Sequence, residues 1–523
     1  MNFIRAALSV YRPTRELPAI SFLFRTFMAQ RIQLTQTSPL AKREVSAEVN
    51  ISNNITTELP FSGKVLLVFA HTDIDCKLQE LQALTNLLDL KIQFQNDTFS
   101  KKGAYLLTEM VSRETALKLS RRSISIRHII EVWYIADSYE DLIADINSHL
   151  NPELRSYLSG NKYSYAIRVS AFAKKLPQDY SLSIINKLEV LQCGGKVNLT
   201  EPELLIQVIE DYGNNPKLAP AKPYRIYIGC LISEGQRKLL AHYSLEKRYF
   251  IGNTSLDPEI CFLMGNLAKV KRGDVVFDPF VGTGSALVSC AHLGAYVMGS
   301  DIDRKILHGW SKCTRSGQVK RFPDECLRKN LEKYGLEGYY LDLLAADAGK
   351  SVWRDEFKCD AILTDPPYGI REGAKKLRKK EKEAPSIDTD EVKKYSKDFY
   401  KFHQYSLADL YLDLFRFSAQ HLVPGGRLVF CFPCMIGDEA NLQALLSCAP
   451  PSLRYITQCS QIFGGNAIRF IVCMEKVLSD NELGQEPAGK LVSKIDKVSL
   501  EKAEKMNTFR TKYFSPNTTI NST

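Results

Sequence analysis

The sequence predicts an α/β protein in which a mixed α+β region is followed by a doubly wound, parallel sheet. From about residue 273 onward, strand-like apolar runs alternate with helical patterns, and a glycine-rich turn follows the first run. Between about 60 and 245, strands and helices are also predicted, but without such a turn. The length of 523 residues is too great for one ordinary core, so two or three domains are expected.

The first region begins with GKVLLVFA at 63–70, a run typical of a buried strand. Five apolar residues then fall on one face of a predicted helix: Ile74, Leu78, Leu81, Leu84 and Leu88. Further strands are predicted at 163–172 and 224–232. Residues 1–60 lack sustained periodicity, and we expect them to form a mostly unstructured extension.

The N-terminal 43 residues are rich in arginine and contain a single acid, Glu16. This composition is typical of a mitochondrial transit peptide. A disordered extension, or translation that starts at Met28, explains it equally well. No apolar run approaches the roughly 18–20 residues of a membrane span. We expect a cytoplasmic protein without a membrane segment, and the arginine-rich N-terminus leaves mitochondrial targeting open.

The thirteen cysteines are scattered singly and are odd in number, which predicts reduced thiols and not a disulfide framework. Cys431 and Cys434 form the one Cys-x-x-Cys pair, inside an apolar run. A zinc site would need a second pair of ligands nearby, so we predict buried core cysteines and no metal site. The net charge of +10 suits a polyanionic partner, although many proteins are equally basic.

The second region is predicted to contain the parallel sheet. Its strands are expected at 274–280, 295–301, 359–369, 427–433, 452–457 and 467–475, with a long polar helix after the second. A lysine-rich segment at 375–394 interrupts this alternation and is predicted to be a mobile surface insertion. It begins six residues after Gly369 and offers four candidate contacts to a nucleic-acid backbone: Lys375, Lys376, Lys379 and Lys380. A solvated loop without a role is the alternative.

The first chemical motif is DPFVGTGS, which runs from Asp278 through Gly282 and Gly284 to Ser285. Glycines at a strand-to-helix turn let the backbone approach a ligand closely. Leu287 stands where a dinucleotide fingerprint needs its third glycine, and Asp278 would repel a pyrophosphate, so NAD fits poorly. A carboxylate there suits a cationic ligand such as the ammonium group of S-adenosylmethionine.

Two further acids follow later strand-like runs. Asp301, in GSDID, is placed to accept hydrogen bonds from two ribose hydroxyls. Asp347, in LAADAG, could accept a hydrogen bond from an adenine amine. A solvated turn aspartate explains each acid alone, but their order and spacing behind Asp278 favour a cofactor site.

The decisive motif is TDPPYG, which contains Asp365, Pro366, Pro367 and Tyr368. An exocyclic amine on a base is a poor nucleophile because its lone pair is delocalised into the ring. The Asp365 carboxylate and the Pro366 carbonyl can accept its two N–H groups and stabilise the positive charge that develops during methyl transfer. The prolines fix the direction of these acceptors, and Tyr368 can stack on an extruded base. An ordinary rigid turn is the alternative.

These motifs together resemble a known family. DPFVGTGS with DPPY resembles the amino-methyltransferases of nucleic-acid bases. The run from 243 to 268, with both motifs and the closing FRTKYF at 509–514, resembles the catalytic subunit of tRNA guanosine-10 N2-methyltransferases. Residues from about 63 to 245 resemble the THUMP-containing, RNA-binding part of that family. The first 60 residues have no counterpart in it.

The resemblance implies a Rossmann-like methyltransferase domain at 246–480, after a THUMP-type RNA-binding region at 61–245 and before a C-terminal tail at 481–523. It implies that S-adenosylmethionine donates one methyl group to N2 of a guanine in tRNA. By motif, Thr254 and Ser255 would lie near the methionine end of the cofactor. The family also implies a heterodimer with a small zinc-binding activator subunit.

Three other functions remain as alternatives. A DNA amino-methyltransferase shares DPPY, but the first region resembles an RNA-binding module. A non-catalytic RNA-binding protein would have no reason to keep Asp365, the two glycines and Asp301 together. A sister enzyme that modifies a guanine in the acceptor stem is the third alternative.

Overall fold

The computed structural model describes residues 60–70, 72–94, 103–172, 174–311, 325–369, 374–377, 402–464, 466–477 and 505–514. All of them belong to the second of two units in the chain, Asn54–Thr523. The predicted extension at 1–60 lies outside the described residues except for Pro60, and so do residues 378–401, which include most of the lysine-rich segment.

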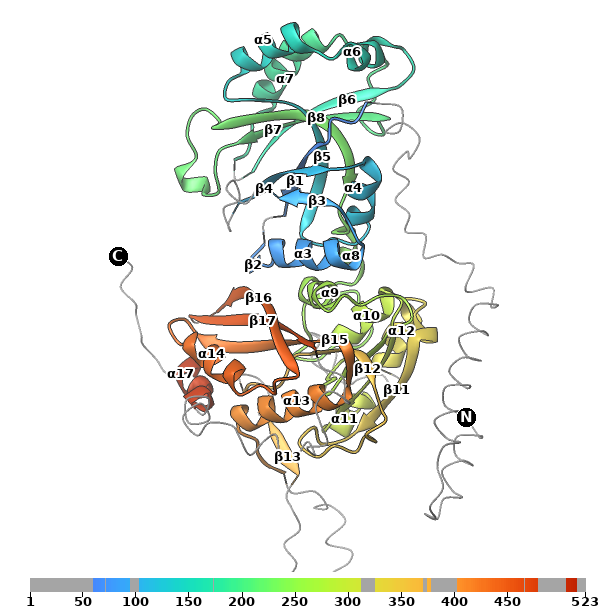
Figure 1. The fold of residues 1–523 in the computed structure, drawn as a ribbon, viewed down its shortest axis with the longest axis vertical. Helices are drawn as coiled ribbons and strands as arrows, with labels where there is room; N and C mark the ends of the chain where they lie inside the picture. Colours follow the sequence, from blue (N-terminus) through green and yellow to red (C-terminus); the bar gives the residue numbers. More distant parts are fainter. Residues whose placement is uncertain are drawn as a thin grey trace, which may run out of the picture. The chain divides into compact units, whose positions relative to one another are not determined.

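Seven strands of the first region form one sheet, in the order β3-β4-β1-β5-β8-β7-β6 (Figure 1). They are β1 (Lys64–Phe69), β3 (Ile92–Phe94), β4 (Tyr105–Met110), β5 (Ile126–Ala136), β6 (Tyr165–Ala171), β7 (Leu204–Asp211) and β8 (Arg225–Glu234). Neighbouring strands are antiparallel, except that β6 and β7 are parallel. The strands predicted at 63–70, 163–172 and 224–232 are confirmed as β1, β6 and β8.

Helices pack against this sheet and bury its apolar side chains. They are α3 (Lys77–Leu87), α4 (Arg113–Ser120), α5 (Tyr139–His149), α6 (Pro152–Ser159) and α7 (Gln178–Lys187). The short helix α8 (Lys238–His242) follows β8, and its Leu239 and Leu240 pack against the core of the second sheet. The predicted helix at 74–88 starts three residues late, because Ile74 belongs to the two-residue strand β2 (Ile74–Asp75). Strand β2 pairs with a strand of the second sheet and not with the first.

The second sheet has eight strands in the order β11-β10-β9-β12-β15-β17-β16-β2. They are β9 (Val275–Asp278), β10 (Tyr296–Asp301), β11 (Tyr340–Ala345), β12 (Cys359–Thr364), β15 (Leu422–Met435), β16 (Leu453–Phe463) and β17 (Ala467–Lys476), with β2 at the edge. The five strands from β11 to β15 are parallel, whereas β17 and β16 are antiparallel. The doubly wound sheet is confirmed, but it is mixed and not purely parallel.

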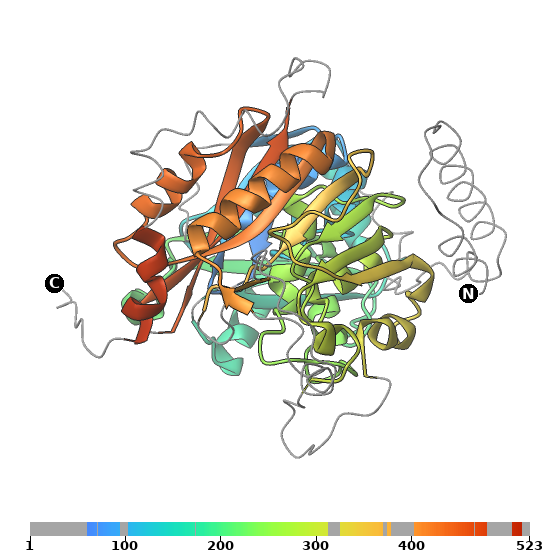
Figure 2. The same ribbon diagram turned by 90° about the horizontal axis from the view of Figure 1, so that it is seen from below.

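Successive residues of the central strands fill two different cores, because side chains alternate between the faces of a sheet. Val276 packs with α9 (Pro258–Leu267) and α10 (Ser285–His292), whereas Phe277 packs with α13 (Leu407–His421). Figure 2 shows α13 lying across one face of the sheet. Ser406 caps α13 by accepting a hydrogen bond from the backbone of Asp409 at 3.0 Å, a contact typically worth about 1 kcal/mol.

Shorter elements connect these strands. They are α11 (Arg304–Leu307), α12 (Leu327–Lys333), α14 (Ala440–Ser447), and an antiparallel pair, β13 (Lys375–Leu377) with β14 (Phe402–Gln404). The prediction of a long polar helix after 295–301 is therefore wrong for the described residues, because α11 has only four residues. The lysine-rich segment does not begin as a free loop either, since its first three residues form β13. The 3₁₀ turn Lys505–Thr508 and α17 (Phe509–Phe514) come last.

One prediction about the cysteines is wrong. Cys76 and Cys459 form a disulfide, whereas every cysteine was expected to be reduced. The two residues are 383 positions apart in sequence, and they come together only because β2 pairs with β16. Cys431 and Cys434 lie in β15 and are buried, in agreement with core cysteines.

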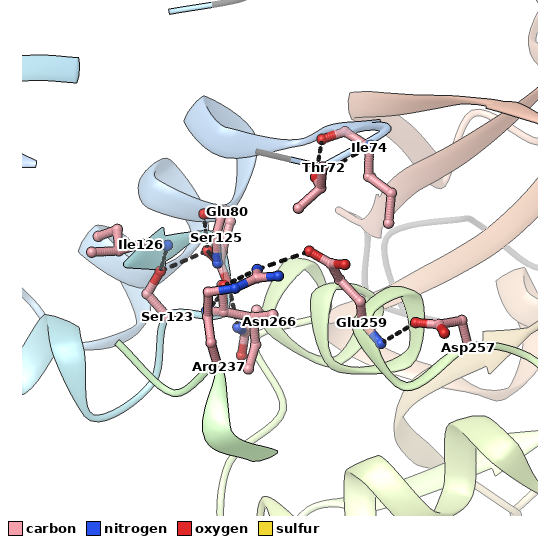
Figure 3. A network of polar contacts seen from close by, with 11 residues as sticks. Thr72, Ile74, Glu80, Ser123, Ser125, Ile126, Arg237, Asp257, Glu259 and Asn266 are labelled. Carbon is pink, nitrogen blue, oxygen red and sulfur yellow. Dashed lines mark hydrogen bonds and ion pairs between the residues drawn. The ribbon is translucent and has the colours of Figure 1, made fainter. Parts of the chain in front are cut away.

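A buried polar network joins α3 to α9 (Figure 3). The Glu80 carboxylate accepts hydrogen bonds from Asn266 Nδ2 at 2.6 Å, from Ser123 Oγ at 2.7 Å and from the backbone of Ile124 at 2.8 Å. Arg122 Nε donates to the other end of the Asn266 amide at 2.7 Å. Both Glu80 and Asn266 are fully buried, so this contact is a fixed joint between the two sheets.

Candidate functional site

The predicted site residues follow the ends of neighbouring strands. Asp278 is the last residue of β9, Asp301 is the last of β10, and Asp365 follows Thr364, the last of β12. Because these strands are parallel and adjacent, their carboxyl ends meet at one edge of the sheet, where ligands of such sheets bind. The topology therefore brings the three acids together from positions up to 87 residues apart.

The turn after β9 depends on its glycines. Gly282 and Gly284 have φ angles of +51° and +76°, in the left-handed region that glycine adopts without strain. The backbone of Gly284 donates to Val281 at 2.7 Å, and α10 starts at Ser285. Ser285 Oγ accepts a hydrogen bond from the buried Arg248 at 2.6 Å, so this hydroxyl anchors Arg248 beside the turn.

Asp278 links the glycine turn to the DPPY turn. Its Oδ1 accepts hydrogen bonds from Thr364 Oγ1 at 2.6 Å and from the backbone of Phe280 at 2.9 Å. Burial raises the pKa of Asp278 to about 7, and the nearby carboxylates of Asp301 and Asp365 act in the same direction. A buried carboxyl in this electrostatic environment favours a cationic partner.

Asp301 holds the glycine turn from the neighbouring strand. Its Oδ2 accepts from the backbone of Gly282 at 2.8 Å, and its Oδ1 accepts from the backbone of Asp303 at 2.8 Å. Each carboxylate oxygen has a second lone pair, so hydroxyl donors can still be accommodated. The structure therefore places Asp301 in contact with the glycine turn, and its role toward ribose hydroxyls stays a prediction.

Asp347 lies in the wall of a pocket beside this edge. The pocket is lined by aromatic, apolar and polar side chains, among them Phe280, Ser300, Asp347, Trp353 and Phe417. Asp347 is buried, and its Oδ1 accepts a hydrogen bond from the backbone of Gly349 at 2.9 Å. Aromatic walls with a buried carboxylate acceptor suit a planar heterocycle that carries an amine.

Thr254 and Ser255 lie differently. Ser255 Oγ shares a hydrogen bond with Thr283 Oγ1 at 2.7 Å and accepts one from the backbone of Gly252 at 2.8 Å. Ser255 therefore borders the glycine turn, whereas Thr254 is exposed. No contact of Thr254 with the turn is recorded among the described residues.

The DPPY turn carries a carboxylate oxygen that is not used within the protein. Oδ1 of Asp365 is buried and has no hydrogen-bond partner among the described residues. Burial raises the pKa of Asp365, while the positive charge of Arg469 works to lower it. Pro366 is buried and Pro367 is partly buried, and their rings fix the φ angles at both positions.

Tyr368 is partly buried and contacts residues of two later elements. Its hydroxyl accepts a hydrogen bond from Arg469 Nη2 at 2.6 Å, and its ring meets Phe509 edge-on at 6.3 Å between centroids. A Cβ atom on Gly369, whose φ is +89°, would lie 3.2 Å from Arg510 Cδ. The short helix α17 therefore packs directly on the DPPY turn.

The predicted lysine contacts are only partly described. Lys375 is exposed. Lys376 is partly buried, with its ammonium 3.8 Å from Asp413 and 4.6 Å from the centre of the Tyr405 ring. Lys376 therefore already has partners within the protein, whereas Lys379 and Lys380 lie outside the described residues.

Sequence reasoning missed three residues of this site. Thr364 joins the two turns, Arg469 reaches the DPPY turn from β17, and Phe509 covers Tyr368. A lone arginine inside the apolar run AIRFIVCME was a detectable signal for Arg469. In the described ranges no group of three or more His, Cys, Asp or Glu could hold a metal ion. No helix of those same ranges is long and apolar enough to cross a membrane.

Comparison with known proteins gives two family matches. Residues 63–237 match the Tmrp11 THUMP N-terminal domain, and residues 246–381 match the RMKL-like methyltransferase domain. Among solved structures, TrmN from Thermus thermophilus has a TM-score of 0.40 and 18% sequence identity, over 79% of this chain and 100% of that chain.

Full-length relatives are considerably more similar. The tRNA (guanine(10)-N(2))-methyltransferase TRMT11 of Pongo abelii is 39% identical over 415 residues, which cover 79% of this chain and 88% of the relative. The tRNA (guanine(10)-N(2))-methyltransferase of Saccharomyces cerevisiae is 30% identical over 425 residues, 79% of this chain and 93% of the relative. These matches, at 30–39% identity over 79% of the chain, show that the chain belongs to the THUMP-containing tRNA (guanine(10)-N2)-methyltransferase family.

Proposed function

We propose that this chain transfers a methyl group from S-adenosylmethionine to the exocyclic N2 of guanosine 10 in tRNA, giving N2-methylguanosine. The observation that carries the proposal is the buried, unpartnered Oδ1 of Asp365 at a strand end next to Asp278. A buried acceptor without a hydrogen-bond partner among the described residues lies here beside a glycine turn of the kind that binds a cofactor. Such an acceptor suits an amine that donates hydrogen bonds while it is methylated. The relatives' names supply the identity of the nucleoside.

The residues at the sheet edge fit the chemistry of S-adenosylmethionine. Asp278 would face its ammonium group, Asp301 would accept from the ribose hydroxyls, and Asp347 would accept from the adenine amine in the aromatic pocket. Gly282, Gly284 and Ser255 would line the methionine end, with Thr254 at its exposed margin. When bound, this cofactor supplies an electrophilic methyl group.

The DPPY turn would hold and activate the amine. Asp365 and the Pro366 carbonyl each accept one N–H of guanine N2, which directs the nitrogen lone pair out of the ring plane. As N2 gains the methyl group it becomes positively charged, and the Asp365 carboxylate stabilises that charge. The raised pKa of Asp365 then makes it a suitable acceptor for the proton that N2 must lose.

The first region would hold the tRNA, in line with the THUMP match and the net charge of +10. Exposed Lys375, and Lys379 and Lys380 beyond it, would add phosphate contacts near the DPPY turn. Lys376 is a weaker candidate, because it already contacts Asp413 and Tyr405.

We also propose a small zinc-binding activator subunit as partner. What supports a partner on the sheet domain is the edge strand β11, which pairs only with β10 among the described strands. Leu344 in this strand is 43% exposed. Apolar side chains beside an unpaired strand edge favour contact with another protein.

The experiment is nucleoside mass spectrometry of tRNA after incubation with isotopically labelled S-adenosylmethionine, with and without the activator. The wild-type protein should form labelled N2-methylguanosine at position 10. Asp365→Ala and Asp365→Asn should each lose at least roughly 10²–10³ in rate, because one preorganised charged acceptor is removed. Calorimetry should show that both variants still bind the cofactor. A variant that keeps more than half of the wild-type turnover would refute this mechanism.

A further inference from the structure

Arg469 occupies an unusual place for a charged side chain. It lies in β17, where it pairs with Pro433 of β15 and Gln461 of β16, and the next residues, Phe470, Ile471 and Val472, are all buried. A cation in the interior of a sheet is costly to desolvate unless it meets acceptors. Its position therefore demands an explanation beyond the fold.

Arg469 contacts the DPPY turn and also two residues of β16. Its guanidinium lies 5.0 Å from the centre of the Phe463 ring and 5.9 Å from that of Tyr368. Nη2 donates to the Tyr368 hydroxyl at 2.6 Å, and Nη1 donates to Gln461 Oε1 at 3.5 Å. Burial works to lower the pKa of Arg469, but Cys431, Asp365 and Tyr368 raise it on balance, so the side chain stays cationic.

Two complementary groups at this place are left unused. Nε of Arg469 is a buried donor without a hydrogen-bond partner, and Oδ1 of Asp365 is a buried acceptor without one, and they do not bond to each other. Asp365 is nevertheless close enough for its charge to act on the pKa of Arg469. Buried polar groups are rarely left unpaired in native proteins, and such pairs of orphans mark places where a ligand completes the hydrogen bonding.

The ligand that completes this pair needs a donor and an acceptor on one molecule. Guanine carries both: the N2 amine donates, and the O6 carbonyl accepts. Arginine is the side chain most often used to bind guanine O6. We propose that Arg469 is the residue that selects guanine, donating to O6 while Asp365 accepts from N2. This inference rests on the proposed function and adds to it the residue that recognises the base.

A purely structural explanation has to be separated from this one. Arg469 could serve only to hold the Tyr368 hydroxyl. In that case Tyr368→Phe, which removes the hydroxyl and keeps the ring, would have the same effect as changing Arg469. Variants of Arg469 and of Tyr368, each tested on two different bases, therefore distinguish recognition of the base from support of the Tyr368 hydroxyl.

The experiment uses full-length tRNA with either guanosine or 2-aminopurine riboside at position 10. The second base keeps the 2-amine but lacks O6. Single-turnover methylation rates are measured for the wild-type protein, Arg469→Met and Tyr368→Phe, with the activator present if it is required. The intrinsic reactivity of the two amines cancels when the rate ratio of guanosine to 2-aminopurine is compared between proteins.

The expected result is that Arg469→Met lowers this ratio on the order of 10- to 100-fold, since a charged hydrogen bond to O6 is lost. Tyr368→Phe should keep the wild-type ratio. An unchanged ratio in Arg469→Met, or an equal fall in Tyr368→Phe, would overturn the inference. A wild-type protein that methylates both tRNAs equally fast would also overturn it, even if Arg469→Met failed to fold. Absence of N2-methylguanosine from the wild-type reaction on guanosine tRNA would instead refute the proposed function.

Discussion

At the scale of single residues, the ionisation of Asp278 should govern cofactor binding. Burial raises the pKa of this carboxyl to about 7 in the cofactor-free protein. A cationic ammonium group binds the ionised form, which is present above that pKa and is lost as the pH falls through it. The Kd for S-adenosylmethionine should therefore rise by up to about tenfold per pH unit below 7. Calorimetry between about pH 5.5 and 8.5 measures this dependence.

Asp278→Asn is the matched control for this pH profile. It preserves the shape of the side chain and removes its ionisation, so the variant should bind more weakly than the wild-type protein at pH 8 and show a flatter profile. A wild-type affinity that does not change over this range would mean that Asp278 does not face a cation.

Asp301 should contribute to cofactor affinity through its two oxygens. In the cofactor-free protein these already accept from the backbones of Gly282 and Asp303. Asp301→Ala removes the acceptor for the ribose and loosens the glycine turn, so S-adenosylmethionine affinity should fall by the equivalent of about 1.5–3 kcal/mol. Asp303→Ala is the control, because Asp303 is exposed and its carboxylate accepts a hydrogen bond from the backbone of Lys305 in the short helix α11. A larger loss in Asp303→Ala would reverse the assignment.

At the scale of elements, the sequence was sufficient to predict strands and helices whose pattern lies within one short stretch of residues. The runs at 274–280, 295–301 and 359–369 alternate with helices, and the order of Asp278, Asp301 and Asp365 along the chain follows the order of strand ends. The direction of β17 was not predictable in this way, because an apolar run does not show whether its strand is parallel to its neighbour. Pairing of β2 with β16, and with it the disulfide of Cys76, depends on a contact across nearly 400 residues.

The same limit explains which site residues were missed. Arg469 and Phe509 reach the DPPY turn from strands and helices that follow it by about 100 and 140 residues. Nothing in their local sequence shows which loop they meet. The acids, by contrast, lie within or directly after the strands that position them, so strand prediction alone placed them.

Helix α17 should support catalysis by holding the DPPY turn. Phe509 is 3% exposed and meets both Tyr368 and Tyr513, while Lys512 pairs with Asp438 at 2.6 Å. Phe509→Ala removes the buried anchor of a six-residue helix, so α17 should detach without unfolding the sheet domain. We expect single-turnover methylation to fall roughly tenfold, because misplacing reacting groups by about 1 Å can cost up to 10² in rate. Cofactor affinity should remain within about twofold, since the rings that Phe509 meets, Tyr368 and Tyr513, are not among the residues proposed to bind the cofactor.

Phe514→Ala is the control for this variant, since Phe514 is in the same helix but is 57% exposed. Amide hydrogen exchange across 505–514 reports detachment directly. If Phe509→Ala exchanged rapidly in this helix and still methylated tRNA at the wild-type rate, the helix would be dispensable for catalysis.

At the scale of the whole molecule, the buried polar network between the two sheets should determine how well bound tRNA reaches the DPPY turn. Asn266 lies in α9, which packs on the second sheet, and it contacts the buried Glu80 of α3 (Figure 3). It also accepts a hydrogen bond from Arg122, which follows α4. Asn266→Ala leaves a buried carboxylate and a guanidinium each short of one partner, which should lower the free energy of unfolding by about 1–3 kcal/mol.

Asn266→Ala should lower the rate of methylation without weakening the binding of tRNA or of the cofactor. If the first region holds the tRNA, its affinity should remain close to the wild-type value, and cofactor affinity should not change, because neither site contains Asn266. Single-turnover methylation should nevertheless fall several-fold, because guanosine 10 is presented to Asp365 from a scaffold that is less firmly fixed. Asn147→Ala makes the same change at an exposed position of helix α5 and should leave all three quantities unchanged. Wild-type turnover in Asn266→Ala, measured at a temperature where the variant is fully folded, would show that this network stabilises the fold without setting the geometry of methyl transfer.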